Sequence, residues 1–303
     1  MADTAEAKDV SVKKSDAGDA HRTRRVLRQT HRVHKLPVLS IAVLSIIVLG
    51  CIFANVLTDK SPSYMDLYNT AMAPCREFLF GTDTMGRDIF AGIWYGGRIS
   101  LAIGLIAMAI STLIALIIGD ISGCAGDTAD SIIMRLTDII LSIPNLPLVI
   151  LLQAVLGDAN VLSIALVIGV TSWMNMAKVV RTEVRQLRNT EYVIAARSMG
   201  GSFFYVLRRH LAPNLVPSVM FMAVMNIRSA IIAESPLSFL GIGLPTELIS
   251  WGSMLALSEK ALMTNAWWII VIPGAFLAVT LLCITNIADS YRAGLSKRHS
   301  NVV

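Results

Sequence analysis

Long apolar stretches are the feature that most restricts how this chain can fold. A helix rises 1.5 Å per residue, so about 20 apolar residues in a row cross roughly 30 Å of hydrocarbon. The chain is 54% hydrophobic and only 16% charged, and no segment is large enough to form a soluble domain with its own core. The sequence therefore predicts an all-α, polytopic membrane protein with six transmembrane helices, near residues 38–57, 99–119, 132–156, 161–180, 214–233 and 266–287.

Lys and Arg residues are unevenly distributed between the loops. About nine lie in residues 1–36, about seven in residues 178–209 and three after Ala288, against about five in the two loops on the other side. Such an excess marks cytoplasmic segments. We therefore expect a cytoplasmic tail over 1–36, a membrane domain over 37–292 and a cytoplasmic tail over 293–303, with both termini in the cytoplasm. The net charge of +5 follows from this topology, and no aromatic-interleaved basic patch indicates nucleic-acid binding.

Catalytic and metal-binding signatures are missing from the sequence. It contains no Gly-x-x-x-x-Gly-Lys-Ser/Thr loop, no His-Glu-x-x-His and no Gly-x-Ser-x-Gly. The four cysteines lack the spacing of a disulfide framework or zinc site. All five histidines fall on the predicted cytoplasmic side, which disfavours a metal path through the membrane. We predict no catalytic residue, no metal and no cofactor. A six-span chain of this kind is typical of one part of a transporter whose energy source lies elsewhere.

The segment 178–213 is the longest polar interruption in the C-terminal two-thirds of the chain, and it is organised. Apolar residues from Tyr192 to Met199 follow helical spacing, and Gly200 with the next glycine ends that helix. A second short apolar stretch follows, until Pro213 ends the segment before the next span. Two short helices held under a membrane form a docking surface. The alternative is a basic membrane-surface helix that only anchors the topology.

Residues 81–88 form a charged, turn-forming element in the first outer loop. Two glycines frame it, and its notable residues are Gly81, Asp83, Gly86, Arg87 and Asp88. It is either a plain surface turn or a structured contact at the outer mouth. In the second outer loop, the apolar and glycine-broken stretch 237–264 indicates a re-entrant or interfacial piece.

Polar residues also occur inside the predicted spans. Arg135 and Asp138 lie three apart on one helix face, so they can neutralise each other. Pro144 and Pro147 predict a kink in the same span.

The fifth predicted span holds Asn226, Arg228 and Glu234, which are candidates for lining a path. An arginine facing lipid costs roughly 2.5–3.5 kcal/mol on insertion scales. Arg228 is therefore expected to face the protein interior, a partner subunit or a water-filled path. A structural arginine bonded to a neighbouring helix is an equally good reading.

Several motifs together resemble those of bacterial ABC-importer permeases of the dipeptide, oligopeptide and nickel family. The stretch Glu191–Gly200, followed by 209–214, resembles the "EAA" coupling loop of these permeases. The similarity covers about residues 38–292 and includes the motifs Gly81-Thr82-Asp83-x-x-Gly86-Arg87-Asp88, Met134-Arg135-x-x-Asp138, Glu234-Ser235-x-Leu237-Ser238-Phe239-Leu240-Gly241 and Trp251-Gly252-x-Met254-Leu255.

The resemblance implies a set of partners in the bacterial inner membrane. These are a second homologous permease forming a heterodimer, two cytoplasmic ABC ATPases, and an extracytoplasmic solute-binding protein, for import of peptides, nickel chelates or similar small solutes. The residues implied in ATPase coupling are Glu191, Ala195, Ala196, Arg197, Gly200 and Pro213. Ile194 stands where the motif's namesake glutamate usually is. The alternative function is a secondary transporter without an ATPase, although the sequence shows no convincing internal repeat.

Overall fold

The computed structural model describes residues 36–206, 209, 211–257, 261 and 265–300. The predicted N-terminal tail therefore lies almost wholly outside the described residues. The described part is helical and contains no strand, with one isolated bridge between Thr82 and Asp88. Its main helices are α2 (Leu36–Ile52), α4 (Ile89–Cys124), α5 (Asp127–Leu141), α6 (Asn145–Leu156), α7 (Val161–Thr171), α8 (Met174–Leu187), α11 (Ala212–Phe239) and α14 (Trp268–Ser300).

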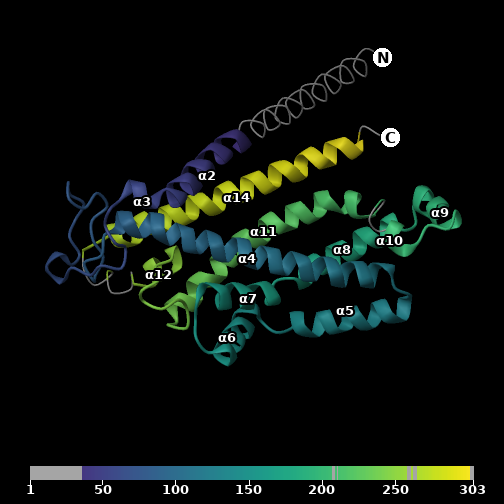
Figure 1. Ribbon diagram of the computed structural model, residues 1–303, viewed down its shortest axis with the longest axis horizontal. Coiled ribbons are helices and arrows are strands. Elements are labelled where there is room, and N and C mark those ends of the chain that lie inside the picture. Colours follow the sequence, from purple (N-terminus) through teal and green to yellow (C-terminus); the bar gives the residue numbers. More distant parts are fainter. Residues whose placement is uncertain (1–35, 207–208, 210, 258–260, 262–264, 301–303) are drawn as a thin grey trace, which may run out of the picture.

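Five short helices lie at the two ends of this elongated bundle. At the left of Figure 1, α3 (Ala54–Leu57), the 3₁₀ turn η1 (Leu67–Asn69) and α12 (Trp251–Ala256) lie with the first outer loop. At the right lie α9 (Glu191–Ser198) and α10 (Phe203–Val206). The predicted outer-loop element and the predicted coupling segment are thus at opposite ends of the molecule.

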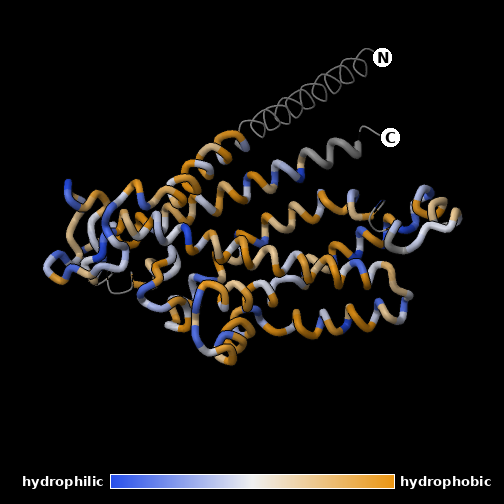
Figure 2. Tube along the Cα trace, viewed as in Figure 1, coloured by the Kyte–Doolittle hydropathy of each residue, from blue (hydrophilic) through white to orange (hydrophobic). Residues whose placement is uncertain are grey.

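The described helices fit a multi-pass membrane protein, although the predicted count of six spans is not confirmed. Three helices, α4, α11 and α14, are long and apolar enough to cross a membrane, and up to five spans result if each of two bent pairs counts as one. The N-terminal apolar helix α2 is shorter, at 17 residues. Apolar residues make up most of the length of these helices (Figure 2). Many of their large apolar side chains are exposed, as expected for a protein surrounded by lipid.

Both bent pairs fall where single spans were predicted. The predicted span 132–156 is divided into α5 and α6, which meet at 87°. Pro144 precedes the first residue of α6 and has no N–H with which to continue α5, so the expected kink is a complete break. The predicted span 161–180 is divided into α7 and α8, bent by 46° at Ser172 and Trp173, and α8 continues to Leu187.

The helix α4 is the centre of the bundle, and glycines on its surface allow the other helices to approach closely. It begins at Ile89, well before the predicted Ile99, and packs against α2, α7, α8 and α11. A Cβ atom added at Gly119 would lie 2.7 Å from Cβ of Val180 on α8, and one added at Gly104 would lie 3.1 Å from side-chain atoms of α11. Small residues therefore set the helix spacing here.

Candidate functional site

The helix α9 is held to the bundle on one side and open on the other. Val193 and Ala196 are buried in a cluster with Val184 of α8 and Leu211 before α11. Glu191 is the first residue of α9 and is exposed, as is Ala195. Arg197 also belongs to α9, but its side chain lies outside the described part of the structure. The burial pattern fixes how α9 sits against the body of the protein.

Gly200 ends α9 by a left-handed backbone turn. Its φ is +85°, and the N–H of Gly201 donates to the carbonyl of Ala196 at 3.0 Å, the long-range bond of a Schellman cap. No atom lies within 4 Å of a Cβ built at Gly200, so only the backbone conformation restricts this position. A Cβ on Gly201 would lie 2.6 Å from the Ala196 oxygen. The glycine pair thus fixes the direction in which the chain leaves α9.

The open side of α9 is largely apolar. Ile194, at the position of the family's glutamate, is 52% exposed, and Met199 is 82% exposed. Tyr192 and Tyr205 are exposed beside them. Pro213 lies in the first turn of α11, not before it as predicted, because the first turn is where a helix tolerates proline.

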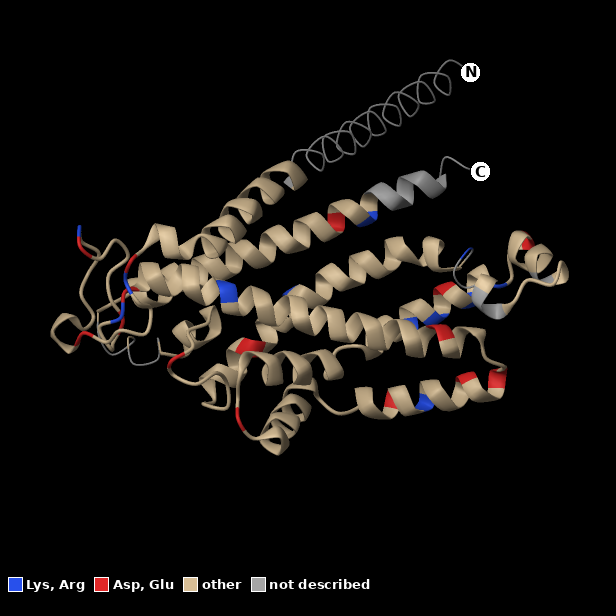
Figure 3. Cartoon of the chain, in the orientation of Figure 1, with Lys and Arg blue, Asp and Glu red and all other residues tan. Residues whose placement is uncertain are grey.

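The basic residues of α8 bind within the chain, which the charge asymmetry did not predict. Asp138 was expected to pair with Arg135, but it instead forms an ion pair with Lys178 of α8. Figure 3 shows acidic residues along α5 and basic residues on α8 at the same end of the bundle. Spacings of three and four between the basic residues of α8, from Lys178 to Arg188, were the sequence signal for this arrangement.

In the outer loop, Asp83 organises the turn. Its Oδ1 accepts from the N–H groups of Met85 and Arg87, each at 2.8 Å, and its Oδ2 accepts from Nε of Arg87 at 2.9 Å. Both side chains are buried or nearly so, and Nη1 of Arg87 donates to the carbonyl of Thr246 at 3.3 Å. The element is therefore a structured contact that joins the loop before α4 to the loop between α11 and α12.

The remaining residues of this element shape the start of α4. Asp88 is the N-cap of α4, accepting from the N–H of Phe90 at 2.9 Å. Gly81 and Gly86 have φ of +76° and +75°. A Cβ at Gly86 would lie 1.8 Å from the carbonyl oxygen of Asp66, so a side chain there is excluded.

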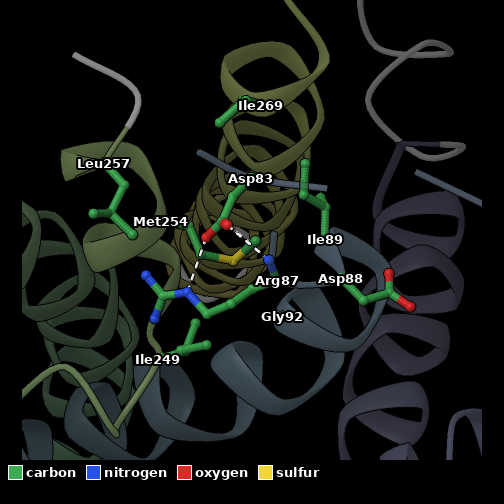
Figure 4. Close-up of a pocket in the computed structure, with 9 residues that line it drawn as sticks. All are labelled: Asp83, Arg87, Asp88, Ile89, Gly92, Ile249, Met254, Leu257 and Ile269. Atoms are coloured by element: carbon green, nitrogen blue, oxygen red, sulfur yellow. Dashed lines mark hydrogen bonds and ion pairs between the residues drawn. The ribbon is translucent and has the colours of Figure 1, made fainter. Parts of the chain in front are cut away.

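A small hollow lies beside the Asp83–Arg87 pair (Figure 4). Ile249, Met254 and Ile269 form its apolar walls. Of the charged groups that line it, Asp83 and Arg87 are bonded to each other, and Oδ2 of Asp88 lies 3.6 Å from Nζ of Lys60. Among the described residues, no group of three or more His, Cys, Asp or Glu side chains is placed to hold a metal ion.

The three candidate path residues of α11 have separate surroundings. Asn226 donates to Oγ of Ser111 on α4 at 3.0 Å. Glu234 is fully buried, and its Oε1 accepts from the hydroxyl groups of Ser238 and Ser250, each at 2.6 Å. Because its carboxyl group is enclosed, Glu234 lines no open path in this conformation. Arg228 is half-buried, and its Nε has no hydrogen-bond partner among the described residues.

The short helix α12 lies within the stretch 237–264, which the sequence predicted only as a re-entrant or interfacial piece. Trp251 is fully buried; its Nε1 donates to the carbonyl of Ile93 at 2.9 Å and its backbone N–H donates to Oγ of Ser100 at 3.1 Å. Ser250 caps α12 and also binds Glu234. Glu234 therefore fastens α12 to α11, and Trp251 fastens it to α4.

Comparison with known proteins agrees with this arrangement. Residues 116–300 match the family described as "Binding-protein-dependent transport system inner membrane component". The chain is 36% identical over 267 residues to the oligopeptide transport system permease protein OppC of Bacillus subtilis, covering 88% of this chain and 87% of that protein. It is 32% identical over 265 residues to the dipeptide transport system permease protein DppC of the same organism, covering 88% and 82%.

The fold is also similar to a solved structure. A chain of the MetNI methionine ABC transporter in an inward-facing conformation matches with a TM-score of 0.57 at 16% identity, covering 67% of this chain and 95% of that chain. This likeness concerns the fold. The family match and the two permeases confirm the resemblance that the motifs indicated: the chain belongs to the family of binding-protein-dependent transport system inner membrane components, the permease subunits of ABC transporters.

Proposed function

We propose that this chain is a permease subunit of an ATP-driven importer of peptides or related small solutes, including nickel chelates, and that it docks a cytoplasmic ATPase through α9. The observation that carries the proposal is the exposure of two large apolar side chains, Ile194 in α9 and Met199 just after it, on a segment whose Val193 and Ala196 are buried. The names of its relatives support peptides as the solute class.

A groove on a partner protein suits α9. Ala195 is small and exposed, so a partner's backbone can approach the helix there. Burial of Ile194 and Met199 would remove apolar surface from water, at about 25 cal/mol per Å². The exposed Glu191 would add a charged contact. With Ile194 in place of the family's glutamate, the central contact is apolar.

The remaining subunits follow from the same proposal. A second homologous permease supplies the other half of the path, two ABC ATPases hydrolyse ATP, and an extracytoplasmic solute-binding protein delivers the solute. The chain itself is not an enzyme. It resides in the bacterial inner membrane with both termini in the cytoplasm, which is supported by the direction of α14, whose C-terminal end points toward the α9 end of the bundle (Figure 1).

Arg228 is the best candidate for a residue on the path. Its Nε lacks a partner within the described chain, whereas Asn226 and Glu234 are bonded to neighbouring helices. A guanidinium in the path would attract a substrate carboxylate, as a peptide carries. We expect Arg228→Ala to assemble fully and to lose uptake of substrates with acidic ends, and Arg228→Lys to retain part of it. Unchanged uptake by Arg228→Ala would show that the side chain is structural.

Co-purification in mild detergent tests the docking proposal. The chain is expressed with the proteins of its genomic neighbourhood as wild type, Ile194→Asp, Met199→Asp and the control Leu67→Asp. Leu67 is 77% exposed in the outer loop, so the control adds the same charge to an equally open apolar site. We expect the ATPase to be lost from the two α9 variants only, while the second permease remains in all four. Retention of the ATPase by both α9 variants, or a wild type that purifies alone, would contradict the proposal.

A further inference from the structure

One face of α8 carries a row of basic side chains, and each of them is bonded inside the chain. The row consists of Lys178, Arg181 and Arg185 of α8, together with Arg188, the residue that follows the last turn of α8. Residues at spacings of three and four share one face of a helix. A row that served only to hold the loop in the cytoplasm would need nothing more than water around it.

The centre of the contact is Asp130 of α5, which is 2% exposed. Arg181 donates to both of its carboxylate oxygens, with Nε at 2.5 Å from Oδ1. Nη1 of Arg185 lies 3.3 Å from Oδ2, and the hydroxyl of Ser122 on α4 donates to Oδ1 at 2.5 Å. One carboxylate therefore joins three helices, and its two-pronged contact with Arg181 fixes direction as well as distance.

Contacts on either side extend this joint along α5. Arg185 donates at 2.5 Å to Asp127, which lies in the first turn of α5. Lys178 binds Asp138, which lies near the C-terminal end of α5. These outer contacts are more exposed, so water screens them more strongly than the contact at Asp130.

The last member of the row reaches α4. Nη1 of Arg188 donates to the carbonyls of Gly123 at 3.0 Å and Ala125 at 3.1 Å, where α4 ends. Carbonyls at a helix C-terminus lack partners within the helix and attract positive charge. The row of α8 is thus bonded over its whole length.

Apolar packing contributes little to the position of α5 in this chain. Of its 15 residues, only Asp130 and Thr137 are buried, and the large side chains Ile132, Leu136 and Ile139 are exposed. The contacts that locate α5 against α8 are therefore mainly ionic. We call the set formed by Lys178, Arg181, Arg185 and Arg188 with Asp127, Asp130 and Asp138 the charge clasp.

The position of the charge clasp connects two parts of the molecule that the sequence leaves unrelated. Only residues 188–190 separate α8 from α9, and α5 leads into the 87° break before α6. We propose that the charge clasp makes α5 follow α8 when an ATPase displaces α9, with Asp130 as the positioning residue. The inference rests on the proposed function of α9.

Pulsed electron-spin distance measurements on the assembled transporter test the proposal without knowledge of the solute. Spin labels are placed at exposed positions, in a chain whose four native cysteines are replaced. Leu282 on α14 is the reference, Ser198 reports on α9 and Leu136 reports on α5. The change measured is the shift in the 282–198 and 282–136 distances when ATP and vanadate are added.

Four variants distinguish a contact that transmits the movement of α8 to α5 from one that only holds α5 in place. We expect both distances to shift in the wild type. In Asp130→Asn, we expect the 282–198 shift to remain and the 282–136 shift to be lost. In Asp130→Glu, which keeps the carboxylate, we expect the 282–136 shift to return. The control Asp158→Asn removes an exposed carboxylate that lies outside the charge clasp, and both shifts remain. If Asp130→Asn does not assemble, Arg185→Gln removes one contact to Asp130 and leaves the pair with Arg181, and we expect a reduced 282–136 shift.

The outcomes that overturn the inference differ from those that overturn the proposed function. An unchanged 282–136 shift in Asp130→Asn, or in Arg185→Gln where the former does not assemble, overturns the role of the charge clasp. A wild type in which α9 moves and α5 does not also overturns it. A wild type in which the 282–198 distance does not respond to ATP contradicts the docking of an ATPase on α9, and the inference then fails with it.

Discussion

Adding one methyl group at Gly119 is expected to push α8 away from α4. The new Cβ would lie 2.7 Å from Cβ of Val180 and 2.8 Å from the carbonyl oxygen of Ala177. Carbon atoms pack best at about 3.5–4.0 Å, so the two helices must part by about 1 Å. Because one of the contacts is a backbone oxygen, a rotamer change of Val180 cannot relieve it.

The cost of Gly119→Ala follows from the contacts along this seam. Met176, Ala177, Val180 and Val184 of α8 are all buried in the cluster shared with α4. A gap of roughly 0.5–1 Å loses about a quarter to a half of each dispersion contact. Overpacking of this kind costs about 1–3 kcal/mol. At roughly 2–4 °C per kcal/mol, a 2 kcal/mol loss lowers the Tm by about 4 to 8 °C.

Thermal unfolding in detergent measures this effect, with Gly274→Ala as the matched control. Gly274 also lies inside a helix, but the nearest atom to its added Cβ is 3.8 Å away, an ordinary contact. Both variants gain the same helix propensity, about 0.5–1 kcal/mol. The control is therefore expected to keep or raise the Tm. A Tm for Gly119→Ala equal to that of Gly274→Ala would refute the reasoning about the seam.

Substitutions at two further positions test the end of the molecule that carries α12. Glu234→Ala leaves the hydroxyls of Ser238 and Ser250 without their acceptor and is expected to cost about 2 kcal/mol in unfolding free energy, whereas Glu234→Gln keeps an acceptor oxygen and should cost less; equal Tm values for the two would contradict this. Asp83→Asn keeps an acceptor for the turn but leaves the buried Arg87 without an ion partner, which is expected to cost about 3 kcal/mol in the stability of the loop before α4. Limited proteolysis should therefore cut this loop faster in the variant, and an unchanged cleavage rate would count against the prediction.

The apolar runs predicted that spans exist, but not how they are directed. Hydropathy along 132–156 is continuous, yet the structure breaks it at Pro144 by 87°. Hydropathy also placed the start of α4 too late, near Ile99, whereas the helix begins at Ile89. Gly96, Gly97 and Arg98 lower the apolar score near Ile99, but the glycines are there to admit neighbouring helices: a Cβ at Gly97 would lie 2.4 Å from Sγ of Cys51. The glycines that lower the mean hydropathy here are the residues that allow close packing.

Charge predicted a side of the membrane, but not the partners of the charges. The basic residues of 178–188 meet carboxylates 40 to 58 positions earlier in the chain. Such pairs depend on which helices lie side by side, and one sequence does not contain that information. Local geometry was more readable. The glycine-framed turn at 81–88 was predicted as a turn, while its bond to Thr246, 159 residues away from Arg87, was not.

The residues of the coupling segment show the same division. The end of α9 at Gly200 follows from its left-handed backbone, which glycine adopts most easily. That Ala196 faces the core while Ala195 faces outward depends on the cluster around Val193, which only the packed structure defines. The roles of these residues toward an ATPase remain predictions.

The burial of Trp251 has a consequence for how the protein is made. Its two hydrogen-bond partners, the Ile93 carbonyl and the Ser100 hydroxyl, belong to α4, and they leave the ribosome more than a hundred residues before Trp251 does. Until α12 is made, the Ser100 hydroxyl lacks the Trp251 amide, and the indole ring that packs against α4 is absent. The contact between α12 and α4 therefore forms only after α11 has been synthesised, and a chain truncated after α11 would leave uncovered the part of α4 that Trp251 packs against.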